Sequence, residues 1–359
     1  MGFSHLRAYN YRNLLDLKLD LDAKNICLVG NNGQGKSNIL EALYVLSYGS
    51  SFRTHLDSLL INQGQTEAAL SAEFNQDGFP VKLDIRFVKS KKSILMDDNP
   101  VQDRKDLVSI VPCIIFSHDD FEFAAGAPDR RRWFFNQTMS LAEPNYIDYL
   151  RNYSHILRVR NQSLKNQQYE LLDVLDSQLA QAGNIIQKKR KQIVEQFNMN
   201  FAQVFRKISG LPFELSINYR TQWAVEDGIT EALYEIKKRR DMDIRLSTST
   251  SGPHRDKFIF LANGKDFSAI ASTGQLRLLS LLLRASQAKY IATVFNKKPV
   301  LLLDDVLLEL DAEKRKKFME ILPEYQQAFF TFLPDEEFSQ YIKGDTIIYR
   351  VENGRCTRG

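Results

Sequence analysis

The sequence predicts an α/β fold with a mixed β-sheet, interrupted in its middle by a mostly helical segment. A glycine-rich loop lies between an apolar strand and a helix near residue 30, and a second apolar strand ends in two aspartates at residues 304 and 305. The long stretch between them has helical periodicity. Uninterrupted apolar strands are typical of buried parallel sheets. At 359 residues, the chain is long enough for two domains.

The glycine-rich loop, GNNGQGKS, fits G-x-x-x-x-G-K-[ST] at every fixed position. Such a loop turns backbone N–H groups toward phosphate oxygens. Lys36 would bring positive charge to the β- and γ-phosphates, and Ser37 would offer a hydroxyl to Mg²⁺. A strand at 25–30 and a helix from residue 38 disfavour a chance turn. We therefore expect a nucleotide to bind to Gly30, Asn31, Asn32, Gly33, Gln34, Gly35, Lys36, Ser37 and Asn38.

Beyond the loop, EAALSAEFN and FPVKLDIRFV alternate as half-buried strands do. The middle is predicted to form helices at 143–165, with Pro144 near the first turn, at 172–193 and at 229–245. A strand is expected at 212–220, and the polar segment 247–254 is interpreted as a linker. The second helix has a seam-like spacing that favours intramolecular packing over a partner site, with apolar residues at Leu172, Leu175, Leu179, Ala182, Ile186 and Ile193. We expect one domain from residues 1–129 and 246–359, and a helical arm at 130–245.

Two carboxylates follow the strand at 300–303, where ligands bind in open α/β sheets. Asp304 is predicted to hold Mg²⁺ and its water shell. Asp305 is predicted to orient or deprotonate the attacking water, and with Lys36 it forms the catalytic pair. The alternative is an Asp-Asp turn after a core strand, but a phosphate loop in the same chain favours the nucleotide site.

A helix opens with Ser272-Thr273-Gly274-Gln275 about thirty residues before the two carboxylates. This order of elements is the layout of an ATP-binding-cassette (ABC) head, in which such a segment contacts the γ-phosphate held by a second copy. Ser272, Gly274 and Gln275 are therefore expected to bind nucleotide across a homodimer. An ordinary N-cap followed by glycine is the alternative.

The net charge of +4 is unevenly distributed. Residues 130–245 contain 19 Lys and Arg against 13 Asp and Glu, a net +6. A basic surface can bind nucleic-acid phosphates, although a solvated helix face is the common alternative. The candidate DNA contacts are Lys188, Lys189, Arg190, Lys191, Lys237, Lys238, Arg239 and Arg240; Arg130-Arg131-Arg132 is expected to be structural. No apolar run reaches membrane-spanning length, and three widely spaced cysteines suit a reducing cytoplasm.

The chain resembles the bacterial RecF family, ABC-type ATPases related to the heads of SMC proteins. The resemblance runs nearly end to end and is densest from Gly30 to Thr54, including Ser51-Phe52-Arg53. It recurs in GAPDRRR, GPHRD, ASTGQLR and LLLDDVLLELDAEKR. Departures from the family pattern occur at His118, Asn136, Lys257 and Thr273, and they leave the roles of these residues and of Asp120 open.

The resemblance implies a slow, DNA-stimulated ATPase that acts as a nucleotide switch. Such proteins use ATP and Mg²⁺, dimerise on ATP, and bind duplex DNA at single-strand gaps or junctions. They help RecA to load together with RecO and RecR, in DNA repair, replication, recombination and the SOS response. An SMC-like chromosome organiser is the alternative, but it would need much longer arms. A transporter subunit would carry a shorter insert and a histidine after QQAFFTF, and a nuclease regulator would need a further metal domain.

Overall fold

A computed structural model of the chain describes residues 2–76, 79–89, 91–108, 110–212, 214–223, 228–295, 298–336 and 344–359. The chain divides into two compact units, which are Met1–Asp120 with Leu283–Gly359, and Phe121–Leu282. The predicted arm at 130–245 lies within the second unit. The domain boundaries at 129 and 245 stay a prediction.

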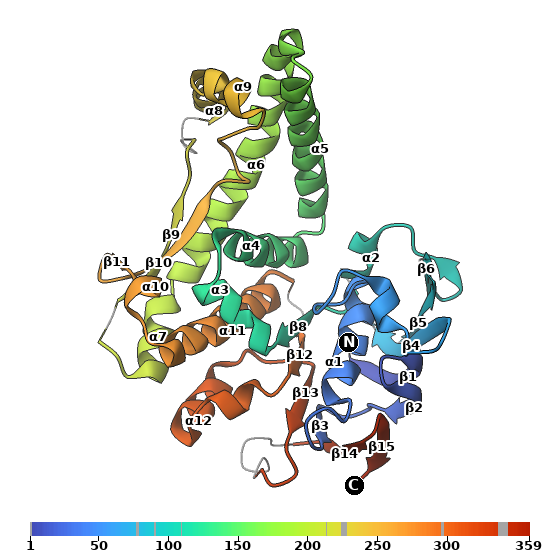
Figure 1. Cartoon of the computed structure of the whole chain (residues 1–359). Coiled ribbons are helices and arrows are strands. Elements are labelled where there is room, and N and C mark those ends of the chain that lie inside the picture. The colour runs from blue at the N-terminus through green and yellow to red at the C-terminus, as the bar shows by residue number, and fades with distance from the viewer. Residues whose placement is uncertain are drawn as a thin grey trace. The chain divides into compact units, whose positions relative to one another are not determined.

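The first unit contains a mixed sheet that carries the phosphate loop (Figure 1). Its central strands β3, β13, β12 and β8 are parallel, β14 is parallel to β3, and β15 is antiparallel to β14. The strands predicted at 25–30 and 300–303 are confirmed, and their apolar side chains are buried. In spatial order the sheet consists of β15 (Arg355–Arg358), β14 (Thr346–Glu352), β3 (Asn25–Val29), β13 (Gln327–Phe332), β12 (Val300–Leu303) and β8 (Cys113–Phe116).

A second sheet of the same unit is wholly antiparallel, so its strands alternate between buried and exposed side chains. The two strands predicted from alternation are confirmed as β4 and β5. The order is β2 (Leu14–Asp20), β1 (Phe3–Tyr11), β4 (Glu67–Gln76), β5 (Phe79–Val88), β6 (Lys91–Met96) and β7 (Asn99–Pro100). The helices of this unit are α1 (Lys36–Tyr48), η1 (Asp57–Leu60), α2 (Arg104–Val108), η2 (His118–Asp120), η4 (Val306–Glu309) and α12 (Ala312–Ile321).

The second unit is mainly helical. Its longest helices, α5 (Tyr146–Lys165) and α6 (Leu172–Asn198), lie side by side (Figure 1). All six seam positions predicted on α6 are buried, which confirms that the seam is intramolecular. The other elements are α3 (Phe121–Ala125), α4 (Pro128–Ala142), η3 (Tyr169–Leu171), α7 (Phe201–Ser209), α8 (Gly228–Lys238), α9 (Arg240–Leu246), α10 (Phe267–Ile270) and an antiparallel sheet of β9 (Leu215–Arg220), β10 (Lys257–Ala262) and β11 (Lys265–Asp266). Helix α11 (Thr273–Phe295) begins in this unit and ends in the first.

Two expectations for the second unit need correction. The single helix predicted at 229–245 is broken at Arg239, and the next residue, Arg240, forms ion pairs with Asp173 and Asp176 of α6. The predicted linker at 247–254 is irregular but packed, because Ser249 and Ser251 are buried. None of the helices in the described part of the chain is long and apolar enough to cross a membrane.

Candidate nucleotide-binding site

The phosphate loop connects the end of β3 to the start of α1 and requires glycine at two positions for different reasons. Gly35 has a φ of 116°, a left-handed conformation, and a Cβ there would lie 2.9 Å from Asn13 Oδ1. A Cβ on Gly30 would lie 2.3 Å from the carbonyl oxygen of Val351. The loop therefore lies directly against the start of β2, at Asn13 and Leu14, and against β14.

Lys36 is the first residue of α1, and its side chain folds back over the loop. Its Nζ donates hydrogen bonds to the carbonyl oxygens of Gly30, at 2.6 Å, and Asn31, at 3.2 Å. The residue is 3% exposed, and it forms no ion pair with any residue that the structure describes. A buried ammonium without a carboxylate partner is suited to an anion beside the loop.

Ser37 and Asp304 meet although they are 267 residues apart, because β3 and β12 flank β13 in the parallel sheet. Ser37 Oγ donates to Asp304 Oδ1 at 2.7 Å. Burial raises the pKa of Asp304 to about 6, and the neighbouring carboxylate of Asp305 acts in the same direction. A hydroxyl and a carboxylate at hydrogen-bond distance form the oxygen donor set that Mg²⁺ uses beside phosphates.

Asp305 has a left-handed conformation, with φ 54°, and is held by Thr331. Its N–H donates to Thr331 Oγ1 at 2.7 Å, and Thr331 Oγ1 donates to Asp305 Oδ1 at 2.7 Å. The hydroxyl therefore fixes both the backbone and the carboxylate of the predicted general base. Thr331 belongs to β13 and lies within QQAFFTF, the segment that no transporter-type histidine follows.

A cavity of 300 Å³ surrounds these groups, and it brings most of the predicted loop residues together with Asp305. Its lining consists of Asn31, Asn32, Gly33, Gly35, Lys36, Ser37, Asn38, Arg53 and Asp305. Gly30 and Gln34 line a different cavity of 610 Å³ beside β14. A third cavity, of 960 Å³, shares Asn38 and Arg53 with the first and includes Arg12, Leu59 and Ile61.

Arg53 belongs to a network that the sequence motifs did not predict. Glu41 of α1 is fully buried, and Arg12 donates to it through Nε at 2.9 Å and Nη2 at 2.8 Å. Ser51 Oγ also donates to Glu41 and accepts the N–H of Arg53 at 2.9 Å. Arg53 Nη1 donates to Asn38 Oδ1 at 2.9 Å and lies 3.7 Å from Glu41. The Ser51-Phe52-Arg53 run was the sequence feature that could have indicated this network, since its serine and arginine both belong to it.

Ser272, Gly274 and Gln275 lie in the second unit, at the start of α11. The N–H of Ser272 donates to Gln275 Oε1 at 2.9 Å, and the N–H of Gln275 donates to Ser272 Oγ at 3.3 Å. This reciprocal pair is a capping box. Ser272 and Gly274 are exposed, and a Cβ on Gly274 would meet no atom within 4 Å. The segment is thus a helix cap within one chain, with a surface that remains free.

The candidate DNA contacts on α6 differ in burial and in whether their charged groups already have partners within the protein. Arg190 is 2% exposed; its Nη1 donates to the carbonyl oxygen of Pro253 at 2.7 Å, and its Nε and Nη2 donate to Asn136. Arg190 is therefore no longer a candidate DNA contact, because a buried guanidinium cannot reach a DNA phosphate. Lys189 pairs with Glu143 at 2.5 Å, whereas Lys188 is exposed.

The basic run at 237–240 is also largely neutralised within the unit. Lys237 lies 3.7 Å from Asp173, and Arg240 pairs with Asp173 at 2.7 Å and Asp176 at 2.6 Å. Lys238 and Arg239 both pair with Glu235, at 3.1 Å and 3.8 Å. Surface pairs of this kind contribute little stability, but they reduce the free charge that a DNA strand would meet.

Two of the family-like motifs form one buried cluster in the second unit. Arg190 lies 3.6 Å from Asp256, the last residue of GPHRD, and binds Asn136, four residues after GAPDRRR. The amide oxygen of Asn136 also accepts a hydrogen bond from the hydroxyl of Tyr146. Arg131 binds three acceptors within the unit, as expected for a structural residue. Lys257 and Thr273 are exposed.

His254 of GPHRD is buried against Tyr153. Its Nδ1 lies 2.7 Å from the Tyr153 hydroxyl, and its Nε2 lies 3.1 Å from the carbonyl oxygen of Ser249. Burial lowers the pKa of His254 to about 4, so the ring is neutral at physiological pH. In the first unit, Asp120 forms a buried ion pair with Arg284 of α11 at 2.8 Å.

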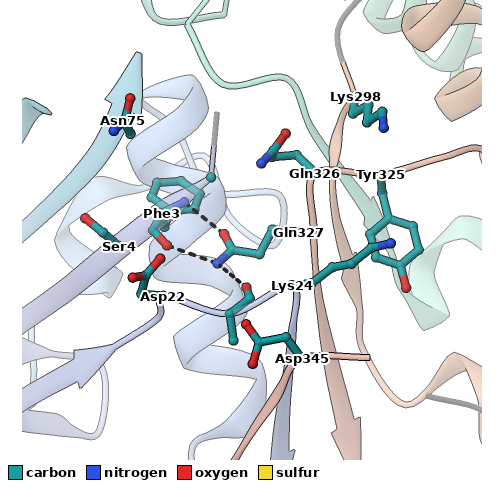
Figure 2. A pocket seen from close by; sticks show the side chains of 12 residues that line it. Phe3, Ser4, Asp22, Lys24, Asn75, Lys298, Tyr325, Gln326, Gln327 and Asp345 are labelled. Atoms are coloured by element: carbon teal, nitrogen blue, oxygen red, sulfur yellow. Dashed lines mark hydrogen bonds between the residues drawn. The ribbon is translucent and has the colours of Figure 1, made fainter. Parts of the chain in front are cut away.

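A cavity of 690 Å³ lies at the opposite, amino-terminal end of β13 (Figure 2). The buried side chain of Gln327 accepts the N–H of Phe3 and donates to the carbonyl oxygens of Phe3, Leu21 and Ala23. Because these bonds satisfy the amide and ligands bind at the carboxyl ends of such strands, Gln327 is a structural tie between β1 and β13.

Comparison with known proteins agrees with this geometry. The model of the RecF/RecN/SMC N-terminal domain matches residues 3–356. The DNA replication and repair protein RecF of Treponema pallidum is 40% identical over 98% of this chain and 99% of its own length. A solved structure of the recombination mediator protein RecF with ATP, in the RecFOR pathway, has a TM-score of 0.90 and 27% identity over 99% of this chain and 97% of its own. The SMC head bound to the C-terminal winged-helix domain of ScpA has a TM-score of 0.60 at 16% identity over 100% of this chain and 97% of its own, which shows the fold alone. The predicted ABC-type α/β head is thereby confirmed.

Proposed function

The chain belongs to the RecF family of DNA replication and repair proteins, and from this premise we propose that it is an ATP-dependent, DNA-binding nucleotide switch. The observation that carries the proposal is the contact between Ser37 and Asp304 beside Lys36, which has no carboxylate partner among the described residues. Lys36 and Ser37 line one small cavity with the glycine-rich loop and Asp305, and Asp304 adjoins it through its hydrogen bond with Ser37. A solved relative of similar fold was determined with ATP.

The loop and α1 would bind the phosphates of ATP. Lys36 would exchange its two carbonyl partners for phosphate oxygens, which are stronger acceptors because they are charged. Ser37 and Asp304 would hold Mg²⁺, which supplies charge neutralisation between the β- and γ-phosphates when it is bound. The larger cavity that shares Asn38 and Arg53 would accept the base and ribose, with Leu59 and Ile61 as apolar surface.

Hydrolysis would depend on Asp305 and would be slow. Asp305 would accept the proton of the attacking water or orient it. Its carboxylate is short and is held by Thr331, so it reaches less far than a glutamate at this position would. This arrangement suits a protein that keeps ATP bound for long periods better than one that hydrolyses ATP rapidly.

The ATP-bound form would be a homodimer. The exposed Ser272 and Gly274 leave room for the γ-phosphate bound to a second copy, and the open space around Gly274 permits close approach. The dimer would bind duplex DNA at single-strand gaps or junctions and act with RecO and RecR in loading RecA. Family membership and the basic second unit support this part of the proposal.

The SMC-like chromosome organiser is the weaker candidate. Helices α5 and α6 contain 20 and 27 residues. At a rise of 1.5 Å per residue they extend about 30 and 40 Å. Such a hairpin cannot bridge the distances that long coiled-coil arms span.

Light scattering tests the proposal directly. The wild-type protein with ATP and Mg²⁺ should double its molar mass, and adding gapped duplex DNA should shift the dimer into a DNA complex. Lys36→Ala is the control and should remain monomeric under both conditions. A wild-type protein that stays monomeric and free of DNA with ATP present would contradict the proposal.

A further inference from the structure

We propose that the outer face of α5 binds the phosphate backbone of duplex DNA; this inference rests on the proposed DNA-binding function. The face consists of Arg151, His155, Arg158, Gln162 and Lys165, which we call the α5 stripe. All five side chains are exposed, and steps of three and four residues place them on one side of the helix. The opposite side is buried and packs against α6.

Most of the positive charge of the α5 stripe is not neutralised by any residue that the structure describes. Arg158, His155 and Lys165 form no ion pair with any residue in the part of the chain that the structure describes. Arg151 pairs with Asp148 at 3.3 Å, and both side chains are about half exposed. Arg160, the remaining arginine of the helix, points inward and pairs with Asp176 and Asp243.

The sequence segment that carries most of the α5 stripe contains no acidic residues. Residues 149–169 contain no Asp or Glu, and neither do residues 177–194 of the adjoining helix α6. The nearest acidic residues in sequence are Asp148 and Glu170, which flank the stripe. These two helical segments thus supply cations and amides but no carboxylate of their own, although Glu143 pairs with Lys189 and Asp148 with Arg151. Lys188 of α6 is exposed on this acid-free segment and belongs to the same proposal.

The spacing of the cations suits a phosphate backbone. Arg151, Arg158 and Lys165 are seven residues apart, so they recur at intervals of about 10 Å along roughly 21 Å of helix. Over that length one DNA strand presents about six phosphates. Exposed amides and hydroxyls, such as Gln162 and Ser154, can donate to phosphates between the cations. The stripe contains no constellation for reading bases, so binding should be insensitive to sequence.

The test compares two variants that each lose two exposed positive charges. The α5 variant is Arg158→Gln with Lys165→Gln. The control is Lys237→Gln with Lys238→Gln, whose lysines have acidic partners at 3.7 and 3.1 Å. Each protein is titrated with a fluorescent 30-base-pair duplex in the presence of ATP and Mg²⁺, between 50 and 200 mM salt. Circular dichroism and ATP affinity confirm that the fold and the nucleotide site are intact.

We expect the α5 variant to reduce the log–log salt slope by about 2 and to lose about tenfold or more in affinity near 0.1 M salt. The control should change the slope by less than half as much. Equal salt slopes of DNA binding for the wild type and the α5 variant would overturn the inference. The α5 stripe would then be better explained as a binding surface for an acidic protein. A larger loss in the control would overturn it as well. If the wild type itself fails to bind the duplex, the proposed DNA binding fails first, and this result differs from a failure of the α5 variant alone.

Discussion

Glu41→Gln is expected to weaken both the fold of the first unit and its affinity for nucleotide. The carboxylate is fully buried and accepts two hydrogen bonds from Arg12 and one from Ser51. The substitution keeps the shape of the side chain but removes its charge. One amide oxygen remains as an acceptor, and the new NH₂ group faces the donors of Arg12.

The size of the effect follows from burial. Breaking a buried ion pair by removing one partner costs about 3–5 kcal/mol. The lower end applies here, because the Arg12 side chain is 22% exposed and can regain some hydration. We therefore expect the free energy of unfolding to fall by about 3 kcal/mol, a large part of the 5–15 kcal/mol that is typical of a domain. The contact between Glu41 and Arg53 adds little to this figure, because it is 3.7 Å long and the arginine is 42% exposed.

Urea unfolding of the purified protein measures the loss, and ATP titration by calorimetry measures the consequence for the site. Arg53→Ala is the matched comparison. It should leave stability within about 0.5 kcal/mol, as surface substitutions usually do. It should nevertheless reduce ATP affinity by about tenfold or more, because Arg53 lines both cavities proposed to hold the nucleotide. Wild-type stability in Glu41→Gln would refute the argument that this carboxylate holds α1 to Arg12.

Lys36→Ala should reduce ATP affinity by at least about tenfold, because the phosphates lose a charged donor; unchanged calorimetric affinity would contradict the assignment. Ser272→Arg should still bind ATP but stay monomeric in light scattering, since a bulky cation would obstruct the second copy; dimers of wild-type strength would show that the segment is only a helix cap. Asp305→Asn should bind ATP, hold the dimer and hydrolyse far more slowly, whereas Asp304→Asn should weaken Mg²⁺-dependent binding; identical single-turnover behaviour would refute the division of roles. The pKa of His254 is about 4 in the folded chain and near 6.5 when unfolded, so stability is retained above about pH 6.5 and lost as the pH falls toward 4. Urea unfolding should show a loss of about 2 kcal/mol between pH 7 and pH 5 that is absent from His254→Gln; equal pH dependence would remove the histidine as its cause.

The geometry of the candidate nucleotide site could be predicted closely from the sequence, because its residues form contiguous motifs. The loop at 30–37 is continuous, and Asp304 and Asp305 directly follow an apolar strand. Strands of this kind place their carboxyl ends at one edge of a parallel sheet, which explains the contact of Ser37 with Asp304. The Glu41 network could not be found in the same way. It joins four residues from three separate segments, which are Arg12 after β1, Glu41 in α1, and Ser51 and Arg53 after α1, and these positions have no periodic spacing.

The candidate DNA-binding charges were harder to predict for a related reason. Contiguous runs such as 188–191 and 237–240 are conspicuous in a sequence, but consecutive residues of a helix point in different directions. One member of the first run is buried, and the second run is paired with acidic residues. The charges of α5 are separated by three or four residues, so they share a face. A search for acid-free helical segments would have identified that face.

The pairing of β3 also has a consequence for synthesis on the ribosome. This strand carries the phosphate loop, and its two neighbours in the sheet are β13 and β14, which follow about 300 residues later. At 5–20 residues per second, translation takes about 15 to 60 seconds to supply them. During that interval no sheet supports the phosphate loop, and both edges of the apolar strand β3 remain unpaired. Messages truncated before Gln327 would therefore yield chains that cannot bind nucleotide and are prone to aggregate, and the nascent chain is a natural client for chaperones.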